Sequence, residues 1–127
     1  MKTIIVLIIM VSGIAHASEP GVVKAFKSDV AYFASALKEA PGCSFTAVSS
    51  SENRRLSVSV EGRGTVEILV KPNDEITASQ KLCRDGSFGA TYEIADVGTL
   101  TLIHEDDGGD SLNISDGKSE LDCTIGQ

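Results

Sequence analysis

The chain has 127 residues and a formal net charge of −7, and its aromatic residues are two tyrosines and four phenylalanines, with no tryptophan. The acids gather late in the sequence: residues 85–127 hold ten acids and one base, Lys118, whereas residues 18–84 hold eight acids and nine bases. This pattern argues against nucleic acid as a partner, because phosphate contacts require clustered lysine and arginine. It favours a basic protein or a weakly bound cation as the partner. The alternative interpretation is a solvated acidic surface that keeps the protein soluble.

The first seventeen residues have the layout of a secretory signal peptide. Lys2 gives a positive start, an almost uninterrupted apolar run follows over residues 3–14, and Ala15-His16-Ala17 matches an A-x-A cleavage site. The apolar run is shorter than the roughly 20 residues that cross a bilayer. We therefore expect a signal peptide over residues 1–17, a single mature domain over residues 18–127, secreted or periplasmic localisation, and no membrane association after cleavage.

Residues 21–40 are predicted to form an amphipathic helix. Pro20 suits the first helical turn, and Pro41-Gly42 is a helix-ending pair. Apolar side chains recur at steps of three and four and form one stripe, made of Val22, Val23, Phe26, Val30, Phe33, Ala34 and Leu37.

After Cys43 the apolar period changes to two, which is typical of strands with one buried face. Turns rich in glycine and aspartate separate the alternating runs, as in antiparallel hairpins. The predicted strands lie near residues 44–50, 55–62, 65–70, 76–83, 89–95, 99–104, 111–115 and 119–125. The sequence therefore predicts an α+β fold, in which one N-terminal helix packs on a curved, mainly antiparallel sheet of six to eight strands, either barrel-like or an open meander.

Three cysteines follow the predicted cleavage site, and in an oxidising compartment two of them are expected to pair. Cys43 is in phase with Phe45 and Cys123 is in phase with Leu121, whereas Cys83 is out of phase with the apolar residues of its strand. We therefore predict a Cys43–Cys123 disulfide between the first and last strands. A Cys83–Cys123 bridge is the alternative, because a shift of one residue in register reverses a phase assignment.

The densest group of reactive side chains is His104-Glu105-Asp106-Asp107-Gly108-Gly109-Asp110. Closely spaced carboxylates are the ligands of hard cations such as Ca²⁺, so the candidate metal ligands are Asp106, Asp107 and Asp110. The run does not match the calcium-loop pattern, and a solvated hairpin loop is the competing interpretation. We expect no cofactor, and the candidate partner-facing residues are Glu105, Asp106, Asp107 and Asp110.

His104 is the only histidine after the predicted cleavage site, so general-base chemistry by a histidine would depend on it. It continues the alternation of Leu100 and Leu102, which puts it at the end of a strand. No serine or cysteine carries a local catalytic signature. These observations favour a non-enzymatic protein without catalytic residues, and a small secreted hydrolase that uses His104 is an alternative.

Residues 87–92, Ser-Phe-Gly-Ala-Thr-Tyr, resemble the S-G-x-x-Y stretch of secreted bacterial inhibitors of c-type lysozyme, with Phe88 inserted. The resemblance implies a small, disulfide-tied antiparallel β-barrel protein, although the W-x-K-G stretch of that family is missing. We expect an exported binding or accessory protein with an acidic C-terminal half. The narrower alternative is an inhibitor of a basic secreted enzyme such as lysozyme, with Asp106, Asp107 and Asp110 facing the enzyme.

Overall fold

The computed structural model describes residues 20–38, 40–82, 87–105 and 108–125. Within these ranges one helix is followed by eight strands: α1 Pro20–Ala36, β3 Cys43–Ser50, β4 Asn53–Val60, β5 Gly64–Val70, β6 Ile76–Leu82, β7 Phe88–Ile94, β8 Gly98–His104, β9 Asp110–Ser115 and β10 Glu120–Ile125. The predicted signal peptide and Cys83 lie outside the described residues. In the described part of the chain, no helix combines the length and the apolar character needed to cross a membrane.

The strands divide into two antiparallel sheets. The strands β6 to β10 form a five-stranded meander, and β3, β4 and β5 form a three-stranded sheet. The predicted α+β class with antiparallel pairing is confirmed, and among the described strands neither sheet closes into a barrel. The two sheets separate at residues 71–75, where Pro72 has no backbone N–H for strand pairing and the Lys71 N–H donates to Asp74 Oδ2 at 2.8 Å.

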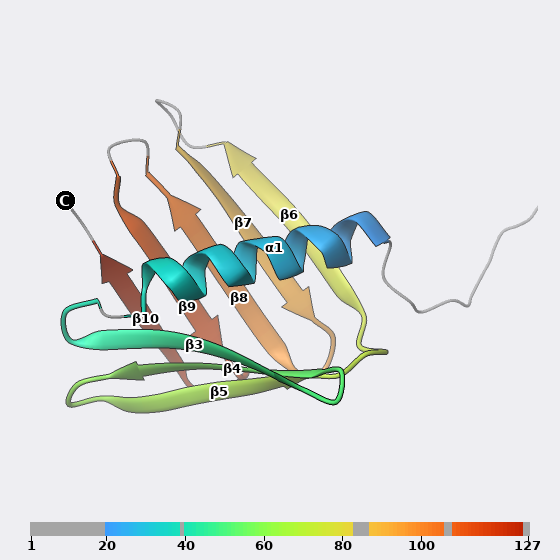
Figure 1. Ribbon diagram of the computed structural model, residues 1–127, viewed down its shortest axis with the longest axis horizontal. Coiled ribbons are helices and arrows are strands. Elements are labelled where there is room, and N and C mark those ends of the chain that lie inside the picture. Colours follow the sequence, from blue (N-terminus) through green and yellow to red (C-terminus); the bar gives the residue numbers. More distant parts are fainter. Residues whose placement is uncertain (1–19, 39, 83–86, 106–107, 126–127) are drawn as a thin grey trace, which may run out of the picture.

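The helix and the three-stranded sheet lie side by side over one face of the five-stranded sheet (Figure 1). We call α1 with β3–β5 the helix-containing layer and β6–β10 the five-stranded layer. In most strands alternate residues are buried between the layers, as Leu56 and Val58 of β4 and Leu112 and Ile114 of β9 are, all at most 1% exposed. The predicted alternation therefore builds one continuous core between the two layers.

Helix α1 is held on the sheet by its apolar stripe. Phe26, Val30 and Phe33 are at most 2% exposed, and each buried side chain of this size contributes about 1.5–3 kcal/mol. The helix ends at Ala36, four residues before the predicted end. Helical backbone is unfavourable for the residue before a proline, so the chain turns ahead of Pro41. After the turn, the Phe45 N–H donates to the Leu37 carbonyl at 3.3 Å.

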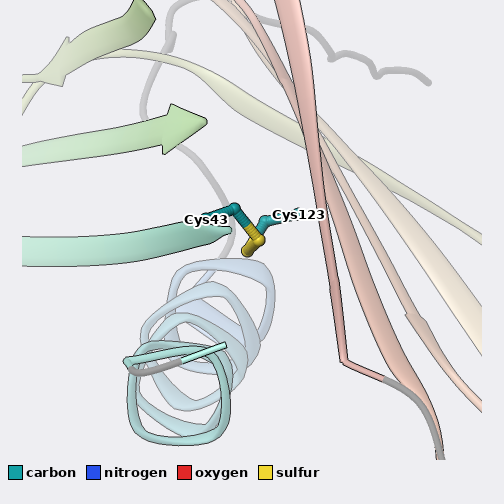
Figure 2. Close-up of a disulfide and its surroundings, with 2 residues drawn as sticks. All are labelled: Cys43 and Cys123. Carbon is teal, nitrogen blue, oxygen red and sulfur yellow. A yellow bond between two sulfur atoms is a disulfide. The ribbon is translucent and has the colours of Figure 1, made fainter. Parts of the chain in front are cut away.

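A disulfide joins the two layers. Cys43 begins β3 and Cys123 lies in β10, with their Cα atoms 5.6 Å apart and a sequence separation of 80 (Figure 2). The predicted pairing is therefore confirmed. Closure of a loop of this length restricts the unfolded chain, which contributes on the order of 4–5 kcal/mol in the loop-entropy model.

Candidate functional site

A hydrogen-bonded group of His104, Asp110 and Tyr32 lies at the loop end of the β8–β9 hairpin. His104 and Asp110 are directly opposite in the strand register, and His104 Nδ1 lies 2.7 Å from Asp110 Oδ1. Tyr32, on α1, donates its hydroxyl to Asp110 Oδ2 at 3.1 Å. Asp110 is only 5% exposed, so its carboxylate is buried. Its hydrogen-bond partners are His104 from the neighbouring strand and Tyr32 from the distant helix α1.

This arrangement fixes the orientation of the imidazole ring. An ionised carboxylate only accepts hydrogen bonds, so the proton on that side of His104 is carried by Nδ1. The Tyr32 ring lies edge-on to the imidazole, with 6.1 Å between ring centroids. Desolvation of its hydroxyl, the hydrogen bond to Asp110 and the charge of that carboxylate all raise the pKa of Tyr32, which keeps the phenol protonated as a donor.

Of the three predicted cation ligands, the structure describes Asp110. Asp106 and Asp107 lie outside the described residues, and Asp110 is the buried partner of His104 and Tyr32. Glu105 is exposed and accepts a hydrogen bond from the Ser87 hydroxyl at 3.1 Å. Among the residues that the structure describes, no three histidine, cysteine or acidic side chains are grouped to hold a metal ion.

A second polar region is the outer face of the five-stranded layer, which points away from the core. Its strands pair so that side chains form regular rows across the sheet. One row is Glu93, Thr99, Ser115 and Glu120, and the next is Thr91, Thr101, Asn113 and Asp122. We call these eight residues the acidic face, because Glu93, Glu120 and Asp122 are its exposed charged members.

Hydrogen bonds hold the acidic face in place. The Thr91 and Thr101 hydroxyl oxygens are 3.2 Å apart, and Asn113 Nδ2 donates to Asp122 Oδ1 at 2.6 Å and to Glu120 Oε2 at 3.3 Å. In the adjoining β9–β10 turn, Asp116 Oδ1 accepts the N–H groups of Ser119 and Lys118, and these bonds lower the pKa of the Asp116 carboxyl.

The functional acids predicted from the sequence lie in the run that follows His104 and do not include those of the acidic face. The signal was available in the strand alternation. Glu93 is out of phase with the buried Tyr92 and Ile94, and Asp122 is out of phase with Leu121 and Cys123. That phase alone directs both carboxylates to the outer side of the sheet.

The helix-containing layer has a different feature, a cleft of about 450 Å³ at the end of the molecule where α1 begins. Its walls come from α1, the β3–β4 turn and the connection between β5 and β6, which lie on the same side in Figure 1. Five of its lining side chains are apolar: Val23, Phe26, Val70, Pro72 and Ile76. Its volume lies within the range of roughly 300–1,000 Å³ that small-molecule sites occupy.

Comparison of the chain with models of known protein families, with curated proteins and with solved structures found no significant match. The geometry of the described residues is therefore the basis for a functional proposal.

Proposed function

We propose that the protein is an exported, non-enzymatic binding protein that uses the acidic face to bind a basic partner protein. The observation that carries this proposal is the exposure of Glu93, Glu120 and Asp122 on one side of the sheet, among hydroxyl and amide groups. Carboxylates in such a position attract a positively charged partner and accelerate its association. Export rests on the predicted signal peptide, and the Cys43–Cys123 disulfide is compatible with an oxidising compartment.

The charge around the acidic face supports the same partner class. The turns at one end of the sheet add the exposed carboxylates of Asp96 and Asp116 beside Glu93. Lys118 is the only base in residues 85–127, so little positive charge in this part of the sequence offsets the carboxylates. An inhibitor of a basic secreted enzyme such as lysozyme is the narrower form of this proposal. Asp110 then has a supporting role, because it is buried against His104.

The test compares two variants that lose the same charge from different parts of the surface. Glu93→Gln/Glu120→Gln/Asp122→Asn neutralises the acidic face, and Glu52→Gln/Glu61→Gln/Glu75→Gln neutralises three exposed acids elsewhere. Binding of each variant to a panel of basic secreted proteins that includes lysozyme is measured by interferometry, together with inhibition of lysozyme. For the true partner, we expect the first variant to lose at least about tenfold in affinity and the second to lose little.

Salt provides a second readout. Affinity of the unmodified protein should fall as NaCl rises from low concentration to about 0.3 M, because the Debye length then drops well below 10 Å. Equal losses in the two charge variants, or an affinity that salt does not change, would contradict the acidic face as the binding surface.

A small hydrolase is the second candidate, and the bond between His104 Nδ1 and Asp110 Oδ1 favours it. A carboxylate that orients an imidazole is the supporting half of many general-base arrangements. A panel of ester, amide and glycoside substrates tests it, with His104→Ala and Tyr32→Phe as the variants. Turnover that His104→Ala abolishes and Tyr32→Phe retains would favour the hydrolase, and turnover that survives His104→Ala would eliminate His104 as its base.

A further inference from the structure

The cleft in the helix-containing layer combines an apolar floor with cations at its sides. Phe26, Val70 and Ile76 are 1%, 4% and 6% exposed, so the floor is formed by core residues. Val23 is half-buried on the first turns of α1 and extends the apolar wall toward the solvent. Such a floor is suited to the hydrocarbon part of a ligand, because contact with the floor removes the apolar surface of the ligand from water.

Three bases line the same cleft: Lys27 from α1, Arg54 from β4 and Lys71 from the connection that follows β5. In the described ranges, the salt bridges join other residues, Arg55 to Glu67 and His104 to Asp110. Arg54 Nη1 donates to the Ser49 hydroxyl at 3.2 Å, which uses one of the five N–H donors of its guanidinium group. In the described residues, none of the three cations therefore forms a salt bridge with a carboxylate.

Two carboxylates also line the cleft, Glu52 and Asp74. Asp74 Oδ2 accepts the Lys71 backbone N–H at 2.8 Å, so one of its oxygens is engaged within its own turn. Glu52 lies in the β3–β4 turn at a φ of 73°. Three bases against two acids give the lining a positive balance in a chain whose net charge is −7.

We propose that this cleft binds a single-chain amphiphile with a carboxylate head group, such as a fatty acid. The hydrocarbon chain contacts the floor formed by Phe26, Val70 and Ile76, and the carboxylate is bound by Lys27, Arg54 and Lys71. Hydrogen bonds between charged partners are about twice as strong as neutral ones, and a guanidinium binds a carboxylate through two parallel bonds. This site is separate from the acidic face and does not depend on the basic-partner proposal.

Dodecanoate is the probe, and its binding to residues 18–127 is measured by calorimetry and by the shift in melting temperature. Ligand that binds the folded state raises the melting temperature through mass action. We expect saturable binding below the micelle concentration. Dodecanol, which has the chain without the charge, should bind at least about tenfold more weakly, which corresponds to about 1.4 kcal/mol. Dodecyltrimethylammonium and acetate should not bind measurably.

Matched lysine variants separate a specific head-group site from general attraction to the helix. Lys27→Gln/Lys71→Gln should weaken dodecanoate about tenfold or more and leave dodecanol unchanged. Lys24→Gln/Lys38→Gln removes the same charge from exposed positions on or beside α1 outside the lining and should bind dodecanoate normally. The acidic-face variant should also bind it normally, so failure of either proposal is distinguishable from failure of the other.

The proposal would be overturned by the absence of saturable dodecanoate binding, by equal affinity for dodecanol, or by equal losses in the two lysine variants. Acetate that binds as tightly as dodecanoate would also overturn it, because the site would then recognise a small anion without a chain.

Discussion

The two layers of this molecule are built from the same alternation of apolar residues, yet they present different surfaces. The five-stranded layer is a regular meander, so its outer side is an array of hydroxyls and carboxylates in rows. The helix-containing layer joins a helix to a sheet, and a cleft forms where α1, the β3–β4 turn and the β5–β6 connection meet. Regular strand pairing thus leaves a continuous face along the strands, whereas hollows form where elements end, at this junction and at the β7–β8 and β9–β10 turns.

The two layers also differ in their numbers of acidic and basic residues. Residues 20–70 carry six bases and five acids, whereas residues 87–125 carry one base and nine acids. A single small chain therefore offers a surface suited to a basic partner and a cleft suited to an anionic ligand. Four substitutions test how the layers are held together and how independent their surfaces are.

Removing the covalent link between the layers should have the largest effect. Cys43→Ser/Cys123→Ser is expected to lower the free energy of unfolding by about 4–5 kcal/mol, because the unfolded chain regains the entropy of an open loop. Urea denaturation with and without reductant measures it. The reductant should destabilise the unmodified protein and leave the variant unchanged. A bridge that contains Cys83 in peptide maps of the unreduced protein would contradict the pairing.

Gly98→Ala tests the close approach of the layers at the start of β8. A Cβ atom there would overlap the Ser115 carbonyl oxygen and lie 3.1 Å from Ile68 Cγ2 on β5. We expect a loss of about 1–3 kcal/mol, as for other overpacked sites. Gly21→Ala is the control, because a Cβ at Gly21 meets nothing within 4 Å. Similar thermal stability of the two variants would show that the backbone at the start of β8 can shift away from both β9 and β5.

Tyr92→Phe tests a polar contact between the layers. The Tyr92 hydroxyl of β7 donates to Asp29 Oδ2 of α1 at 2.6 Å, and its ring packs edge-on against Phe26. Loss of this bond to a charged acceptor is expected to cost about 1.5–3 kcal/mol. Chemical denaturation at neutral pH measures the difference.

The same tyrosine gives a prediction for alkaline pH. Burial first, and then the hydrogen bond and charge of Asp29, raise the pKa of Tyr92 above its ordinary value of 10.0. The unfolded state therefore loses this proton first, so the contribution to stability is complete below about pH 10 and declines as the pH rises further. Tyr92→Phe should show a shallower alkaline loss of stability than the unmodified protein. An unchanged slope would assign the alkaline transition to other groups.

The smallest effect is expected on the outer face of the three-stranded sheet. Arg55 Nε lies 2.9 Å from Glu67 Oε2, and both side chains are about half exposed, 58% and 49%. Solvent screens such a pair, so Glu67→Gln should change the free energy of unfolding by less than about 1 kcal/mol. A larger change that high salt removes would show that this ion pair stabilises the layer.

The strand positions and the disulfide were predictable from the sequence because both depend on local phase. Alternation in a strand fixes which side chains are buried, and Cys43 and Cys123 share the phase of their buried neighbours. The division into two sheets was not predictable, because alternation shows which face is apolar but not which hairpins pair. The break at Pro72 is visible as a turn, yet its effect on sheet membership depends on long-range packing.

The site residues were less predictable for a related reason. Asp110 belongs to an acidic run that is typical of a solvated loop, but it is buried by Tyr32, which lies 78 residues earlier in the chain. The cleft draws on α1, β4 and β5, and no single stretch of sequence contains its three cations. Features made by one element follow from local pattern, whereas features shared by distant elements require the fold.

The bridge between Cys43 and Cys123 also changes what a protease can do to this molecule. It turns residues 43–123 into a covalent ring, so one cut inside that span opens the ring without releasing a fragment. The exposed β4–β5 turn at Gly62 and the β9–β10 turn at Gly117 are natural points of attack, and both lie inside the ring. A chain cut once inside the ring keeps its strands tethered, and two cuts inside residues 43–123 are required before a piece of that span can leave.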